Sequence, residues 1–123
     1  MITAIRYFFA LLFAVSAVGH LLKPALSDGF IPEQLPRPTI QVMAFVVEIF
    51  LAIALLVPKT QYLAAWGTFL LMIVFLPLHI IDAGRARPVI GTPVVAYVRV
   101  AVQFLFIYMA WRLTVAAADP TAL

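Results

Sequence analysis

The sequence predicts an all-α integral membrane protein, a four-helix bundle of antiparallel transmembrane helices running up and down. Of its 123 residues, 66% are hydrophobic and only 11% are charged, whereas soluble domains have about 45–50% and about 25%. A chain of this length buries only part of its surface, so one core cannot hide so many apolar residues. Four separate apolar stretches are each long enough to cross a bilayer as a helix. Lipid is therefore the expected solvent for much of the exterior.

The first apolar segment, residues 2–22, is interrupted only by Arg6 near its start. It also has features of a secretory signal peptide: one basic residue, an apolar run, and the small residues Ser16, Ala17 and Gly19. The signal peptide stays open as the alternative, but we expect a retained first transmembrane helix.

The other three segments cover residues 38–57, 62–81 and 93–113. The second and the fourth open with a proline, which suits the first turn of a helix. Backbone polar groups in lipid must be satisfied within their own segment, so all four segments are expected to be helices. Only residues 58–61 join the second and third segments, which are therefore expected to be antiparallel neighbours.

Two polar connections, residues 23–37 and 82–92, contain prolines, glycines and charged residues and are expected to be irregular surface loops. The tail, residues 114–123, is expected to be frayed. No repeat or change in composition divides the chain, so we expect a single transmembrane domain over residues 1–123. Basic residues are spread almost evenly over the two predicted sides, so the positive-inside rule gives no orientation.

The composition also excludes several classes of function. The chain has no cysteine, which excludes disulfides, thiolate metal sites and a CxxC redox motif on this chain. Any redox chemistry would need a cofactor, a metal or a partner protein to carry the electrons. The net charge of +3 comes without a run of Lys and Arg, so we expect no nucleic-acid partner.

Ionisable side chains inside a membrane span are costly, so each is a functional candidate. The four candidates are His20, Glu48, His79 and Arg99, one in each predicted helix. In a four-span bundle the loops after the first and third helices lie on the same side. At about 1.5 Å per residue, all four candidates then fall in the same half of the membrane or near its midplane. We predict that they form a catalytic group.

Four further polar residues are predicted to bind the substrate beside this group: Ser16, Gln41, Asp82 and Gln103. Residues three, four or seven apart share a helix face, so Ser16 is expected beside His20. Asp82 follows His79 by three residues and could orient it, or it could be a solvated loop residue. Gln103 could instead make a hydrogen bond between helices.

The catalytic candidates also have structural interpretations. Glu48 and Arg99 could form an ion pair that ties the second helix to the fourth, or Glu48 could be a protonated general acid. His20 and His79 could serve only as hydrogen-bonding residues at helix ends. Two histidines and a glutamate also match the ligands of a non-haem iron site, but no local spacing supports one and we predict no metal.

Short motifs along most of the chain carry a family resemblance. They are GHLLKP at residues 19–24, LP at 35–36, VEI at 47–49, LLVP at 55–58, LAAWG at 63–67, FLPLHI at 75–80, and the pair Arg99 and Gln103. Taken together, these motifs resemble the DoxX-like family of small four-helix integral membrane proteins. An asparagine often stands in that family at the position of His79, which is where this sequence departs from the pattern.

The resemblance implies a four-helix bundle in a bacterial cytoplasmic membrane, with both termini in the cytoplasm. Some relatives are associated with thiosulfate:quinone oxidation or with other membrane redox complexes. The expected function is thus a small membrane component of a quinone-linked redox system, with a quinone or another hydrophobic small molecule as ligand. A partner subunit or a second copy of the chain is expected beside it.

Two other functions stay open on the residues alone. The chain could be a stand-alone intramembrane isomerase, cyclase or hydrolase that acts on a lipid-like substrate, with Glu48 as the acid or base and Arg99 as its electrostatic partner. It could also be a non-catalytic assembly subunit in which the buried charges only hold helices together.

Overall fold

The structure is a computed structural model that describes residues 1–119, and all regular structure in that part of the chain is helical. The long helices are α1 (Ile2–Leu22), α3 (Arg37–Ala54), α4 (Gln61–Ala83) and α5 (Pro93–Ala118). The short ones are α2 (Ala25–Asp28) and the 3-10 helix η1 (Pro58–Thr60), which leads directly into α4. Four helical segments are long and apolar enough to cross a membrane. The predicted all-α class with four apolar helices is therefore confirmed.

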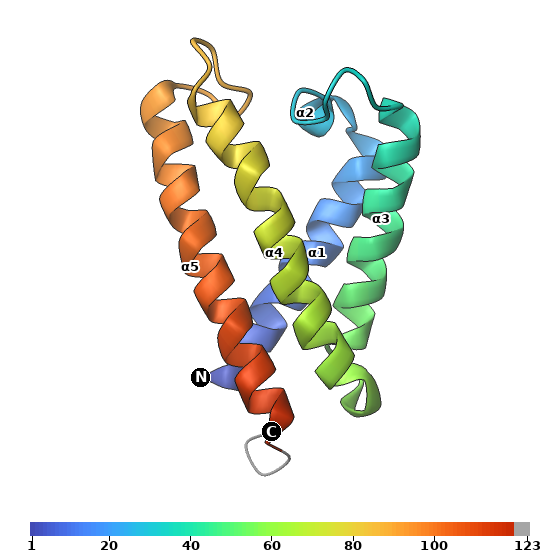
Figure 1. The fold of residues 1–123 in the computed structure, drawn as a ribbon. Helices are drawn as coiled ribbons and strands as arrows, with labels where there is room; N and C mark the ends of the chain where they lie inside the picture. Colours follow the sequence, from blue (N-terminus) through green and yellow to red (C-terminus); the bar gives the residue numbers. More distant parts are fainter. Residues whose placement is uncertain (120–123) are drawn as a thin grey trace.

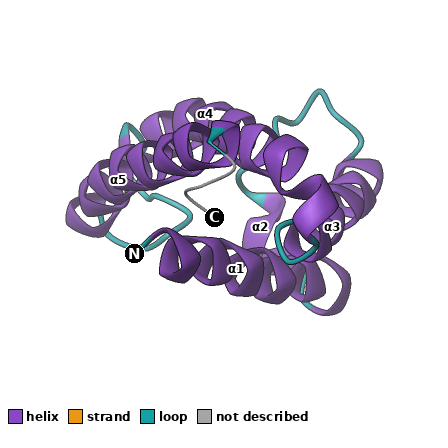
Figure 2. Cartoon of the chain, turned by 90° about the horizontal axis from the view of Figure 1, so that it is seen from below, coloured by secondary structure: helices purple, strands orange, loops and turns teal. Residues whose placement is uncertain are grey.

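The long helices associate as two pairs. Helix α1 packs mainly against α3, and α4 packs mainly against α5. The pairs lie close together near η1 and diverge toward the end that carries α2 (Figure 1). Seen from below, α1 and α3 lie on one side, α4 and α5 lie on the other, and α2 lies between the two sides at the far end (Figure 2).

The hydrophobic core lies where the two pairs converge. Phe9 and Phe13 of α1 are buried in one cluster with three residues from the other helices. These are Leu55, which directly follows α3, Met72 of α4 and Ala110 of α5. Small residues such as alanine let helices approach closely in lipid. The core thus closes the η1 end of the molecule and leaves the α2 end less tightly packed.

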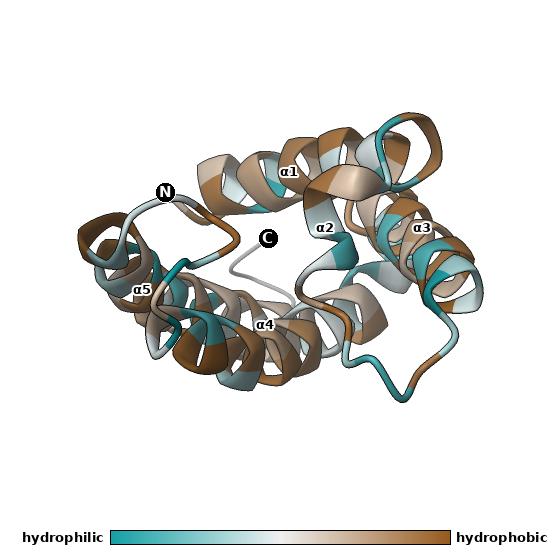
Figure 3. Ribbon diagram, turned by 90° about the horizontal axis from the view of Figure 1, so that it is seen from above, coloured by the Kyte–Doolittle hydropathy of each residue, from teal (hydrophilic) through white to brown (hydrophobic). Residues whose placement is uncertain are grey.

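The exterior is apolar on every long helix. Leu11 of α1 is 66% exposed, Phe50 of α3 is 65% exposed, and Leu63 of α4 and Val94 of α5 are 73% and 72% exposed. Figure 3 shows brown and pale ribbon over much of the long helices, with teal concentrated around α2, the start of α3 and the connecting segments. Soluble proteins rarely expose apolar surface on this scale, so the exterior is consistent with an integral membrane protein.

Helix α3 ends three residues before the predicted boundary at residue 57 because of the proline that follows. A residue before proline is pushed out of the helical region, and Val57 is extended, with φ −95° and ψ 118°. The hydroxyl of Thr60 then donates to the carbonyl oxygens of Ala54, at 2.8 Å, and Val57, at 3.1 Å. These bonds satisfy carbonyl groups that the end of α3 leaves free.

Other boundaries also differ from the sequence-based expectation. Helix α5 continues to Ala118 instead of ending at residue 113, so the first part of the expected frayed tail is helical. The rest of that tail, residues 120–123, lies outside the described residues. The first connection is not wholly irregular, because it contains α2, and the last turn of α4 includes Asp82.

Candidate functional site

A cavity of about 470 Å³ lies between the α1/α3 pair and α4, on the side of α2. We call it the polar chamber. Its polar lining residues come from all four long helices and α2: Ser16, His20, Ser27, Gln41, Glu48, His79 and Arg99. Most of its other lining residues are apolar, and several belong to the segment between α2 and α3. The chamber thus brings together six of the eight predicted site residues, and Asp82 and Gln103 do not line it.

Gln41 fixes the geometry at the α2 end of the chamber. Its side chain is buried near the start of α3, and its Nε2 donates to the carbonyl oxygen of Pro24 at 2.9 Å and to Oδ1 of Asp28 at 2.8 Å. A carbonyl and an ionised carboxylate can only accept, so the amide nitrogen must face them. The amide oxygen of Gln41 therefore faces His20.

This orientation also fixes the protonation of the His20 ring. Nδ1 of His20 lies 2.5 Å from Oε1 of Gln41, and because an amide oxygen only accepts, Nδ1 must carry a proton. The hydroxyl of Ser27 donates to the same oxygen at 3.2 Å. The other ring nitrogen, Nε2, then faces Glu48, whose Oε2 is 3.4 Å away. We call His20 and Glu48 the dyad, and its closest contact joins Nε2 of His20 to Oε2 of Glu48.

Glu48 lies deep in the protein at 2% exposure, with the hydroxyl of Ser16 close to its carboxylate. An isolated buried carboxylate is costly, and a partner that can share a proton lowers that cost. The structure assigns this partnership to His20 on the neighbouring helix α1.

Arg99 does not form the predicted ion pair with Glu48. Helix α5 packs mainly against α4 and α3 packs mainly against α1, so the two side chains reach the chamber from different pairs. Among the described residues Arg99 makes no ion pair, and its Nη1 is buried without a hydrogen-bond partner. Its guanidinium carbon lies 5.3 Å from the centroid of the Phe106 ring, in cation–π geometry. Arg99 thus lines the chamber and carries a buried donor, Nη1, that no described protein group uses.

A smaller cavity of about 90 Å³ lies next to the chamber, toward the core. Ser16, Glu48, Phe75 and Arg99 line both cavities. The smaller one has room for water molecules, which need several polar partners in such a site. Glu48 and Arg99 can therefore interact through water without touching.

His79 lines the chamber from α4, away from the dyad. Its ring packs edge-on against Phe30 at a centroid distance of 5.5 Å. Within residues 1–119 no three histidine, aspartate or glutamate side chains lie close enough together to hold one metal ion. The structure therefore does not assemble His79 with His20 and Glu48 into the triad that the sequence left open.

Asp82 is buried and not solvated, so its interpretation as a solvated loop residue is wrong. It does not line the chamber, and its predicted roles in orienting His79 or binding substrate stay predictions. It is 1% exposed, and its carboxylate accepts from the backbone N–H groups of Val89 at 2.7 Å and Ile90 at 3.3 Å. Arg85 lies 3.4 Å from it and also donates to the carbonyl oxygen of Gly29 at 2.9 Å. Asp82 thus anchors the connection between α4 and α5, and Arg85 ties it to the connection after α2.

Gln103 joins two helices and does not line the chamber. It is fully buried in α5, and its Nε2 donates to the carbonyl oxygen of Met72 in α4 at 2.6 Å. Its Oε1 has no partner among the described residues. The contacts correspond to the helix–helix hydrogen bond that the sequence left open as an alternative to substrate binding.

The site also contains residues that sequence reasoning missed. Ser27 and Asp28 of α2 extend the hydrogen-bonded chain that runs through Gln41 to His20, which lies beside Glu48. Both lie in a connection expected to be irregular. Pro24 before a short run of helix-compatible residues was the one local signal for a helical turn there.

Comparison with known proteins gives a family for the chain. A family model with the description "Domain of unknown function (DUF8561)" matches residues 9–114, a range that includes every residue lining the polar chamber. No curated protein and no solved structure matches the chain. Since the model covers most of the sequence, the chain belongs to the DUF8561 family.

Proposed function

We propose that the four long helices cross a bilayer as an antiparallel up-down bundle and that the polar chamber binds the oxygen-bearing head of a hydrophobic small molecule of the quinone class. The observation that carries this proposal is Arg99, a half-buried cation that lines a cavity of about 470 Å³ and has a donor that no described protein group uses. Small-molecule sites have volumes of about 300–1,000 Å³, mostly apolar walls and a few convergent polar groups.

The side chains around the chamber fit a carbonyl ligand. The free Nη1 of Arg99 can donate to a carbonyl oxygen, and a hydrogen bond from a charged donor is stronger than a neutral one. The His20–Glu48 dyad can give or take a proton at the same ligand. Reduction of a quinone consumes electrons and protons and gives a hydroquinone. The chain's dyad would supply the protons, and a partner redox protein would supply the electrons.

This role agrees with the DoxX-like resemblance, which stays a prediction. Under the proposal the chain is a small membrane component of a quinone-linked redox system in a bacterial cytoplasmic membrane, with both termini cytoplasmic. It acts beside a partner subunit or another copy of itself. The apolar exterior of the long helices supports the bilayer as its surroundings.

One observation favours a second candidate, a stand-alone intramembrane isomerase, cyclase or hydrolase with Glu48 as acid or base. Gln41 holds His20 in one tautomer, with Nε2 toward Glu48, and such fixed geometry is what an acid–base pair needs. Turnover of a lipid-like substrate by the purified chain alone, abolished in Glu48→Gln, would favour this candidate over the redox role.

The proposal is tested by titrating the protein in lipid nanodiscs with a decyl-tailed benzoquinone, using native mass spectrometry to follow binding. Losing a hydrogen bond to a charged group costs about 1.5–3 kcal/mol, so Arg99→Met should weaken binding by roughly ten- to a hundredfold. Arg37→Met, which removes an exposed arginine outside the chamber, is the matched control and should bind normally. Equal affinity of both variants, or no binding by the wild type, would contradict the proposal and favour the assembly subunit.

A further inference from the structure

A second space lies between α3 and α4, beside the polar chamber. This space also measures about 470 Å³, and every residue that lines it is apolar. Val74 of α4 borders both spaces. We call the second space the apolar groove. A polar site and an apolar groove therefore meet at one residue, on a helix that faces both.

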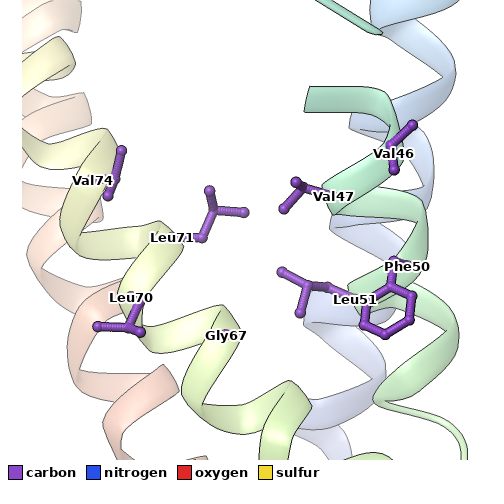
Figure 4. Close-up of a pocket in the computed structure, with 8 residues that line it drawn as sticks. All are labelled: Val46, Val47, Phe50, Leu51, Gly67, Leu70, Leu71 and Val74. Atoms are coloured by element: carbon purple, nitrogen blue, oxygen red, sulfur yellow. The ribbon is translucent and has the colours of Figure 1, made fainter. Parts of the chain in front are cut away.

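The walls of the groove come from helices of different pairs. Val47 and Leu51 of α3 point across the gap toward α4, and Leu71 of α4 points back toward them (Figure 4). The missing side chain of Gly67 keeps the lower end of the groove narrow, because a Cβ there would lie 2.7 Å from Cδ2 of Leu51. The groove thus closes toward η1 and widens toward the chamber.

The other side of the chamber is covered by a bonded segment. Phe30, Ile31 and Leu35 line it from the connection between α2 and α3. Arg85 holds this connection through the carbonyl oxygen of Gly29, and Gln41 holds α2 through Asp28. The gap between α3 and α4 has no comparable polar tie among the described residues, so it is the less restrained route into the chamber.

We propose that the apolar groove holds the hydrocarbon tail of the molecule whose polar head occupies the chamber. The ligand is then a membrane amphiphile that passes sideways from the bilayer between α3 and α4, with its tail turning at Val74. This inference rests on the proposed function and extends it from the head group to the whole molecule. A bilayer lipid lying loosely on α3 and α4, or a second copy of the chain, would be a different occupant.

The experiment should measure where the tail lies on the protein, because the binding affinity of the ligand says little about the tail. Lipid tails are as apolar as the groove, so moving a tail from the bilayer into it gains little from the hydrophobic effect. What the groove supplies is a fixed place for the tail. The test therefore uses photocrosslinking in nanodiscs with two probes that carry a diazirine in a ten-carbon tail, one with a benzoquinone head and one with a carboxylate head.

The expected label falls on peptides that contain residues 46–51 and 67–74, and excess unlabelled probe of the same head removes it. Val74→Trp should lower this label by roughly tenfold, because the larger indole would occupy the space where the tail passes between the chamber and the groove. Val15→Trp on α1 is the matched control, because Val15 is 64% exposed, Val74 is 60% exposed, and Val15 borders neither space. It should leave the label unchanged.

The outcomes separate this inference from the proposed function. Label from the carboxylate probe alone would keep the groove and refute the quinone head. Binding of the benzoquinone that depends on Arg99, with label spread evenly over the outer faces of α1 and α5, would keep the proposed function and refute the groove. Label that is absent with both probes, unaffected by Val74→Trp, or replaced by crosslinks between two copies of the chain would also refute it.

Discussion

Replacing Gln41 by leucine should release α2 and the His20 ring together. The leucine keeps the apolar part of the side chain and the helical preference of the position, but it removes the amide. The variant therefore loses the hydrogen bonds of this amide to Pro24, Ser27, Asp28 and His20. Within residues 1–119 no other side-chain hydrogen bond ties α2 to α3, so the change isolates this connection.

The size of the effect follows from the kinds of bonds that are lost. The bond to the Asp28 carboxylate is worth about 2 kcal/mol, and each neutral bond is worth about 1 kcal/mol. Ser27 and His20 are not fully buried and can partly recover with water, so we expect the local opening free energy of α2 to fall by about 3 kcal/mol. That corresponds to an increase of about a hundredfold in the equilibrium constant for local opening, and in the exchange rate that depends on it.

Hydrogen exchange in nanodiscs measures this opening directly. The reporters are the amides of Leu26, Ser27 and Asp28, which donate to the carbonyl oxygens of residues 23 and 24. Gln34→Leu, a change at an exposed position in the same connection, is the control and should leave their exchange rates alone. If Gln41→Leu exchanges at these amides as slowly as the wild type, the amide does not hold α2, and the argument for the His20 tautomer fails as well.

Three further variants test Asp82 and Gln103, the two predicted site residues that do not line the chamber. Asp82→Ala should destabilise the protein by about 2–3 kcal/mol, because the amides of Val89 and Ile90 lose their acceptor. Asp82→Asn keeps an acceptor oxygen and should lose much less stability. Equal unfolding free energies for the two variants would refute the anchoring role. Gln103→Leu should change the unfolding free energy by less than about 1 kcal/mol, because side-chain hydrogen bonds between membrane helices average about 0.6 kcal/mol. The variant loses the bond from Nε2 to Met72, whereas Oε1 has no partner to lose among the described residues. A larger loss, or weakened ligand binding, would show that the residue does more than join two helices.

The sequence was sufficient to predict the apolar helices, because the length of an apolar run is a local property. Helix α1 has the predicted bounds, Ile2–Leu22, and α5 begins at the predicted Pro93. The error at the end of α3 lies where Pro58 follows an extended Val57 and the Thr60 hydroxyl bonds to the carbonyl oxygen of Ala54. Hydropathy does not register a single hydroxyl group, so such ends escape it.

The sequence predicted which residues line the candidate site better than it predicted which of them contact one another. Periodicity placed His20, Glu48, His79 and Arg99 in one half of the molecule, and all four line the chamber. The choice between His20 and Arg99 as partner of Glu48 depends on which helices pack together. Helix α3 packs mainly on α1, and no local pattern in an apolar sequence encodes that choice.

Asp82 shows the opposite problem. Its place after His79 suggested chemistry, but its carboxylate serves backbone N–H groups several residues further along the chain. A buried acidic residue at the end of a helix can satisfy a loop as readily as a ligand. Only the path of residues 84–92 decides between the two roles.

The most direct measurement for the central claim is an experimental structure of the protein in lipid nanodiscs with the decyl-tailed benzoquinone bound. The account predicts a quinone oxygen within hydrogen-bond distance of Nη1 of Arg99, with the ring beside the His20–Glu48 dyad. A chamber that contains only water, with Arg99 turned to a lipid phosphate or bonded directly to Glu48, would contradict it.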